Sequence, residues 1–218
     1  MQRTITVKGR GHVNVKPDQV ELRLDLEAKD KIYNKSMDMA SKQIEQLKQA
    51  FENEGFSKDS IKTTSFNIRA AYDSVRDKDR NYISVFTGYE CSHGLKLSFD
   101  FDSSRLADAL RAIMKSRVNP RIDIDFTVKN PSAVNEQILQ RAAENARKKA
   151  EILCTASGVK LGALVGIDYN WGEVRFASMT KYKIPCDGAV AAGMPCDIDI
   201  DPDDIEAGDT VTFVWEIE

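Results

Sequence analysis

The stretch from Val20 to Glu27 alternates strictly between apolar and charged residues. Its apolar members are Val20, Leu22, Leu24 and Leu26, and its charged members are Glu21, Arg23, Asp25 and Glu27. Successive side chains of a strand point to opposite faces of a sheet, so this pattern predicts a strand with one buried and one solvated face. Such strands favour antiparallel pairing, because parallel sheets are usually covered on both faces.

The segment after this strand changes to a helical period. Apolar residues recur every three or four positions from Tyr33 to Phe51, and Gly55 stands where a helix-terminating glycine is expected. A second amphipathic helix is predicted to begin at a cap formed by Asp102 or Ser103. Two helices of this kind have an apolar stripe that packs against the buried face of the sheet.

Further strands are predicted at 66–72, 85–99 and 122–128, with a polar hairpin loop at 73–81. Gly88 or Gly94 is expected to mark a bend in the long strand. From residue 20 to residue 128 the order is therefore strand, helix, strand, strand, helix, strand. That order predicts a ferredoxin-like βαββαβ core.

Additional elements flank this core. A first strand places Ile5, Val7, Val13 and Val15 on one face, and Gly9 and Gly11 within it indicate a bulge or bend. A third helix is predicted from the cap Asn130 and Pro131 to Gly158, with an inner ridge of Val134, Ile138, Ala142, Ala146, Ala150 and Leu153. Strands at 164–169 and 211–217 complete the chain.

We therefore predict a two-layer α+β fold with a mainly antiparallel sheet, extended by the third helix and the C-terminal strands. One domain is expected over residues 1–218, with a core at 1–170 and an acidic loop and final strand at 171–218. With 42% hydrophobic and 30% charged residues, the composition excludes a disordered chain and a membrane-spanning one.

The charge of the chain is unevenly distributed. The formal net charge of −3 disfavours nucleic-acid binding, which needs a basic field. Residues 171–218 carry 11 acidic and 3 basic side chains, so the remainder of the chain is mildly basic. The acidic segment is expected to fold back on the body of the chain, to meet a neighbouring copy, or to form a solvated surface.

The first residues run directly into the alternating stretch Thr4–Lys8 and contain no apolar segment typical of a signal peptide. The sequence as written therefore predicts a cytoplasmic protein, with a periplasmic or cell-surface location as the alternative if an export signal was removed. Cys91, Cys154, Cys186 and Cys196 form no Cys-x-x-Cys pair. A disulfide between Cys186 and Cys196 is geometrically conceivable, although reducing cytosol would oppose it.

Several motifs resemble those of the SIMPL family, a domain of unknown function that includes YggE-like and periplasmic immunogenic proteins of bacteria. The opening stretch 5–11 with Pro17-Asp18 is similar to the N-terminal signature of that family. The stretches 61–68, Gly88-Tyr89 and 205–209 resemble later family motifs, and the most specific match is the alanine-rich helix with its exit, AAENARKKAEILCTASGVKLG, at 142–162. The resemblance covers nearly the whole chain.

The resemblance implies an exported or envelope-associated protein linked to stress resistance and signalling. It also implies that some members form large ring-like or channel-like homo-oligomers. It supplies no active site. As written, the sequence is expected to differ from the usual family pattern in lacking a signal peptide and in carrying the acidic, cysteine-bearing segment before the last strand.

One dense carboxylate cluster invites a metal-site hypothesis. It consists of Asp197, Asp199, Asp201, Asp203, Asp204 and Glu206. Hard cations such as Ca²⁺ prefer several such oxygens, but Pro202 and Gly208 break the pattern of an EF-hand loop starting at Asp197. The alternation with Ile198 and Ile200 favours instead an edge strand that uses charge against self-pairing.

No catalytic constellation is evident in the sequence. His93 and Cys91 are two residues apart on one strand, without a third group to position them, and His12 is equally unsupported. The stretch Gly9-Arg10-Gly11 lacks the third glycine and the helix of a dinucleotide fingerprint.

The sequence thus predicts a non-enzymatic protein that needs no cofactor and whose expected partner is a second copy of itself. The alternative is a small-molecule or divalent-cation binding module that uses the acidic segment 197–209.

Overall fold

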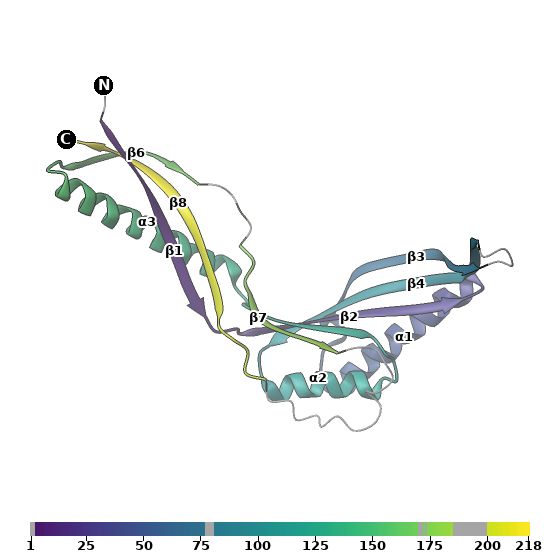
Figure 1. Ribbon diagram of the computed structural model, residues 1–218. Helices are drawn as coiled ribbons and strands as arrows, with labels where there is room; N and C mark the ends of the chain where they lie inside the picture. Colours follow the sequence, from purple (N-terminus) through teal and green to yellow (C-terminus); the bar gives the residue numbers. More distant parts are fainter. Residues whose placement is uncertain (1–2, 77–80, 170–171, 173, 185–199) are drawn as a thin grey trace. The chain divides into compact units, whose positions relative to one another are not determined.

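The computed structural model describes residues 3–76, 81–169, 172, 174–184 and 200–218. Within these ranges the helices are α1 Tyr33–Asn53, α2 Ser103–Lys115 and α3 Pro131–Ala156, with a 3-10 turn at Lys58–Ser60. The strands are β1 Thr4–Val15, β2 Gln19–Asp30, β3 Ile61–Arg76, β4 Tyr82–Asp100, β5 Arg121–Thr127, β6 Leu161–Asp168, β7 Ala177–Ile184 and β8 Ile205–Ile217. Helices and antiparallel strands occupy separate layers, so the predicted α+β class is confirmed (Figure 1).

The chain divides into two compact units. Unit 1 contains Met1–Asp18, Thr127–Met179 and Pro202–Glu218, and unit 2 contains Gln19–Phe126 and Thr180–Asp201. The final strand β8 is the middle strand of the sheet in unit 1. The prediction of one domain over residues 1–218 stays a prediction, because two compact units can share one domain.

Unit 2 is built on a five-stranded sheet in the order β3-β4-β2-β5-β7. Along the chain its elements follow the predicted order from β2 through α1, β3, β4 and α2 to β5, and β7 is an additional strand. Helices α1 and α2 cover one face of this sheet (Figure 1). The identification of this unit as ferredoxin-like stays a prediction.

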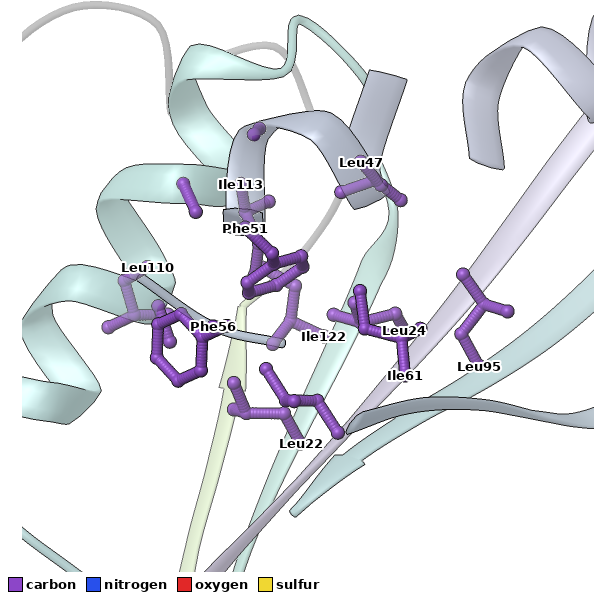
Figure 2. Close-up of a cluster of buried hydrophobic side chains, with 14 of the residues drawn as sticks. Leu22, Leu24, Leu47, Phe51, Phe56, Ile61, Leu95, Leu110, Ile113 and Ile122 are labelled. Atoms are coloured by element: carbon purple, nitrogen blue, oxygen red, sulfur yellow. The ribbon is translucent and has the colours of Figure 1, made fainter. Parts of the chain in front are cut away.

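The core of unit 2 consists of large apolar side chains from β2, β4, β5, α1 and α2. Figure 2 shows the centre of this cluster, where Phe51 and Phe56 meet leucines and isoleucines of the sheet. The four apolar residues of the alternating stretch in β2 are 0–2% exposed, so the prediction of one buried face is confirmed. Burying such side chains stabilises the fold by about 1.5–3 kcal/mol each.

Both glycines of β4 lie at irregularities in the pairing with β3. The register shifts by one residue between Ala71 and Tyr72, opposite Gly88, and again beside Gly94. Gly88 has a φ of +145°, a conformation that side chains rarely adopt. The predicted polar loop 73–81 was too long, because β3 continues to Arg76 and β4 begins at Tyr82.

Unit 1 is a three-stranded sheet in the order β1-β8-β6, on which α3 packs (Figure 1). The cap of α3 is as predicted: Asn130 accepts a hydrogen bond from the backbone N–H of Ala133 at 3.1 Å, and Pro131 follows. Leu153 does not belong to the buried ridge, since it is 50% exposed and Cys154 is buried in its place. The ridge keeps a spacing of four residues from Val134 onward, which leads to Cys154.

The predicted bulge at Gly9 and Gly11 is wrong. Strand β1 pairs with β8 over its whole length without a register shift. The glycines are instead required by α3: a Cβ at Gly9 would lie 2.0 Å from the carbonyl oxygen of Ala142, and one at Gly11 would lie 1.9 Å from that of Ile138. The absence of side chains therefore lets the helix backbone approach the strand backbone directly.

Candidate functional site

The acidic cluster is only partly within the described residues. Asp197 and Asp199 lie outside them, whereas Asp201 and Asp203 are exposed in the segment that precedes β8. Residues 200–204 lie outside any strand, so the edge-strand interpretation is wrong for this part, and Pro202 has no N–H to pair there. Among the described residues, no group of three or more histidine, cysteine, aspartate or glutamate side chains could hold a metal ion.

Cys91 and His93 lie on the core-facing side of β4. The Cys91 thiol is fully buried, and burial raises its pKa, whereas a nucleophilic cysteine needs a lowered one. His93 Nε2 is 3.1 Å from Thr63 Oγ1, and burial together with the charge of Lys48 lowers its pKa. This arrangement forms no activated nucleophile and base.

His12 lies in β1, beside a shallow hollow of about 480 Å³. Arg10, Glu206 and Asp209 also border this hollow, so its charges are mixed. The backbone carbonyl of His12 accepts a hydrogen bond from Arg141 at 2.7 Å. The position of His12 is thus tied to the packing of α3 on β1.

A second hollow, of about 820 Å³, lies at the end of β2 beside the irregularity at Gly88. Its buried carboxylate, Glu90, accepts a hydrogen bond from Arg69 at 2.7 Å and pairs with Lys29 at 3.0 Å. These hydrogen bonds from Lys29 and Arg69 lower the pKa of Glu90. The paired charges join β2, β4 and β3, and the sequence alone gave no signal for them.

The hairpin arm, defined as residues 72–76 of β3 and 82–86 of β4, extends beyond the sheet. Strand β2 pairs with β4 only from Tyr89 onward, so the two strands of the hairpin arm pair only with each other in the described part of unit 2. Large apolar side chains on both faces of the arm are exposed by 41–66%: Tyr72, Val75, Tyr82, Ile83, Val85 and Phe86. The run Tyr82-Ile83-Ser84-Val85-Phe86, in which only Ser84 is polar, was the available sequence signal.

A second exposed apolar surface lies on β6, an edge strand of the sheet in unit 1. Leu164, Val165 and Ile167 are exposed by 50%, 52% and 57%. The sequence analysis predicted the strand but not the exposure of its side chains. Of the helices that the structure describes, none is long and apolar enough to cross a membrane.

Comparison with known proteins agrees with the motifs in the sequence. Residues 5–215 match the SIMPL family, described as a protein of unknown function (DUF541). The chain belongs to the SIMPL family. It is also similar to the 26 kDa periplasmic immunogenic proteins of Brucella melitensis biotype 1 and Brucella abortus strain S19, with 28% identity over 163 residues in each case. The match covers 75% of this chain and 65% of the length of each relative.

Proposed function

We propose that this SIMPL protein acts without catalysis, as a homo-oligomer that assembles through its exposed strand surfaces. The observation that carries the proposal is the hairpin arm, which exposes large apolar side chains on both faces. Soluble monomers rarely expose a contiguous apolar patch of this kind unless a partner covers it.

The hairpin arm is also poorly supported as an isolated element. A two-stranded hairpin is only marginally stable in water. Tyr72 contacts Phe86 edge-to-face at 5.6 Å, and Phe86 contacts Tyr89 at 5.4 Å, so the aromatic contacts continue from the arm to the sheet. An apolar arm that its own sheet supports only at one end favours a specific protein contact over a solvated loop.

We further propose that the protein works in the bacterial periplasm. Both relatives are named periplasmic proteins, which favours the periplasmic alternative over the cytoplasmic location expected from the N-terminal residues. Stress resistance remains the proposed biological context, as the family resemblance implies. Fractionation of cells that express the natural gene would test the location: recovery of the protein only with cytoplasmic markers would contradict it.

The assembly is tested by measuring molar mass with light scattering after size-exclusion chromatography. We expect a mass of several times 24.4 kDa that persists at high salt, because apolar contacts are not screened. Dissociation by salt would instead assign the contact to the acidic segment 171–218. A monomer at every protein and salt concentration would overturn the proposal.

A pair of variants links the mass to the hairpin arm. Replacing both Ile83 and Val85 by lysine places charges on one exposed face of the arm, and we expect the oligomer to dissociate. Asn67→Lys is the matched control, since Asn67 is exposed on β3, pairs with Ser92 of β4 and lies outside the hairpin arm. Equal masses for the two variants would show that this face of the arm is not the contact.

A further inference from the structure

The two edges of the sheet in unit 1 differ in how their backbone groups are satisfied. On the β1 edge, Asn145 of α3 accepts a hydrogen bond from the N–H of Arg10 at 3.1 Å. Arg141 and Lys149 donate to the carbonyl oxygens of His12 and Lys8, at 2.7 and 3.0 Å. Four helical residues rise about 6 Å and two strand residues about 6.6 Å, so every fourth residue of α3 meets every second residue of β1.

The β6 edge has no such cover. In the part of the chain that the structure describes, β8 is the strand that pairs with β6, and no strand lies on its other side. The segment Leu161–Asp168 contains no lysine, arginine or proline, and its one charged residue is Asp168 at the end. Lysine, proline and bulges are the usual features that protect an edge strand from pairing with another chain. Of these, β6 has only irregularities in its pairing with β8.

The apolar face of β6 continues the buried face of the sheet. Leu164 lies opposite Trp215 of β8, and Ile167 lies opposite Phe213, two residues of the core under α3. Helix α3 packs mainly on β1 and β8, so Leu164 and Ile167 remain half exposed. Leu153, near the end of α3, is also 50% exposed.

We propose that β6 pairs antiparallel with β6 of a second copy, about a two-fold axis centred on Leu164. The inference rests on the proposed self-assembly and names one of its interfaces. An antiparallel pair of identical strands is self-complementary, so one surface serves both copies. The pairing joins two three-stranded sheets into one and covers the apolar strip beyond α3.

This register pairs apolar side chains with apolar ones and opposite charges with each other. With Leu164 opposite its own copy, Leu161 faces Ile167, and both belong to the apolar face. Lys160 faces Asp168 of the second copy, which gives an ion pair at each end of the strand. Lys160 and Asp168 are exposed, and the backbone of Lys160 is already fixed by hydrogen bonds with Glu218 at 2.8 and 2.9 Å. A second copy thus brings apolar residues and the opposite charges to the edge at once.

The first test uses Leu164→Lys in the full chain, with molar mass measured by light scattering. The substitution places two like charges at the axis, so we expect the wild-type mass to fall to half or less. Thr6→Lys is the control, since Thr6 is an exposed position of β1 in the same sheet, and we expect no change in mass.

The register is tested by charge reversal. We expect Lys160→Asp and Asp168→Lys each to raise the dissociation constant roughly tenfold, and the double variant to restore it. A structural role of either residue within one chain would not give this mutual rescue. An oligomer whose mass is unchanged by Leu164→Lys and by both reversals would overturn the β6 interface and leave self-assembly intact. A wild-type monomer under all conditions would overturn both.

Discussion

Units 1 and 2 both have an antiparallel sheet covered by helix, yet the side chains at the contact between helix and sheet differ in size. They are large in unit 2, and small where α3 meets β1 in unit 1. In unit 2 the space between sheet and helices is filled by large side chains such as Phe51, Leu24 and Leu95. In unit 1 the closest contact between α3 and β1 places alanines against a glycine, with Ala142 and Ala146 over Gly9, while larger residues such as Phe213 and Trp215 of β8 complete the core. Large side chains that fill the space between helices and sheet stabilise unit 2. The close contact of α3 with β1 in unit 1 instead requires that Gly9 and Gly11 have no side chains.

This difference predicts opposite sensitivities. A core of large residues loses stability when atoms are removed, because a cavity remains. A contact between backbones loses stability when atoms are added, because a helix and a strand must move apart. Stability measurements on substitutions of each kind therefore test the comparison directly.

The largest effect is expected from Phe51→Ala in unit 2. Phe51 is 1% exposed and contacts Phe56 edge-to-face at 5.6 Å, so its removal should cost about 3–5 kcal/mol. Urea unfolding, followed by hydrogen exchange of the Leu24 amide, measures the loss in this unit. In unit 1, Ala146→Gly removes one methyl group and should cost only about 1 kcal/mol. Equal losses for the two variants would contradict the comparison.

Gly11→Ala should have the next largest effect, a loss of about 1–3 kcal/mol in unit 1. The new Cβ would lie 1.9 Å from the backbone carbonyl oxygen of Ile138, which cannot move without displacing α3. Gly166→Ala is the matched control, because Gly166 is also in a strand and no atom lies within 4 Å of its Cβ position. Unfolding by urea should leave the control within about 0.5 kcal/mol of wild type. A stabilised Gly11→Ala protein would show that α3 does not approach β1 so closely.

The same difference explains what the sequence could predict. The alternation in β2 and the helix signals at Asn130 and Gly55 are local, so they predicted strand, cap and helix end correctly. Gly9 and Gly11 are required by the close approach of α3, a helix that lies about 130 positions later in the chain, as the hydrogen bond from Arg10 to Asn145 shows. No local pattern could separate a glycine needed for close approach from one that marks a bulge.

The exposed apolar surfaces of the hairpin arm and of β6 were equally hard to predict from local patterns. The sequence analysis predicted the hairpin but ended its strands too early, because charged and polar residues around Asp73 are typical of a loop. Whether Leu164 is covered depends on which strands α3 packs on, mainly β1 and β8, and periodicity does not determine that choice. The exposure of the candidate interfaces therefore required the tertiary structure, whereas the secondary structure around them did not.

A smaller effect is expected from Asn145→Ala, which removes one of the side chains that satisfy the β1 edge. The Arg10 amide loses its acceptor, so its hydrogen exchange should accelerate, with a loss of stability of about 1 kcal/mol. Glu144→Ala is the matched control, because Glu144 is exposed on the same helix. Exchange of the Leu24 amide in unit 2 should stay unchanged in both variants. An unaltered rate at Arg10 would show that α3 does not protect this edge.

The smallest effect concerns Glu90, a buried carboxylate of unit 2 whose pKa is lowered. Lys29 and Arg69 donate hydrogen bonds to Glu90 and favour its charged form. A lowered pKa in the folded state means that this stabilisation is fully present above the unfolded value of 4.5 and is lost as the pH falls through the folded value. Because Lys29 and Arg69 are themselves 61% and 66% exposed, the contribution should be no more than about 1 kcal/mol.

Unfolding by urea at pH 6, 4.5 and 3 would measure this contribution, with Glu90→Gln as the variant. At pH 6 the variant should be less stable than wild type, and the difference should shrink below pH 4.5, because wild-type Glu90 then becomes neutral as well. Glu27→Gln is the control: Glu27 is 60% exposed and pairs with the same Lys29 at 3.5 Å, so its removal should hardly matter. A difference in stability that stays constant across this pH range would mean that Glu90 stabilises unit 2 by its shape rather than its charge. Glu90 would then act by packing, as the apolar core around Phe51 does.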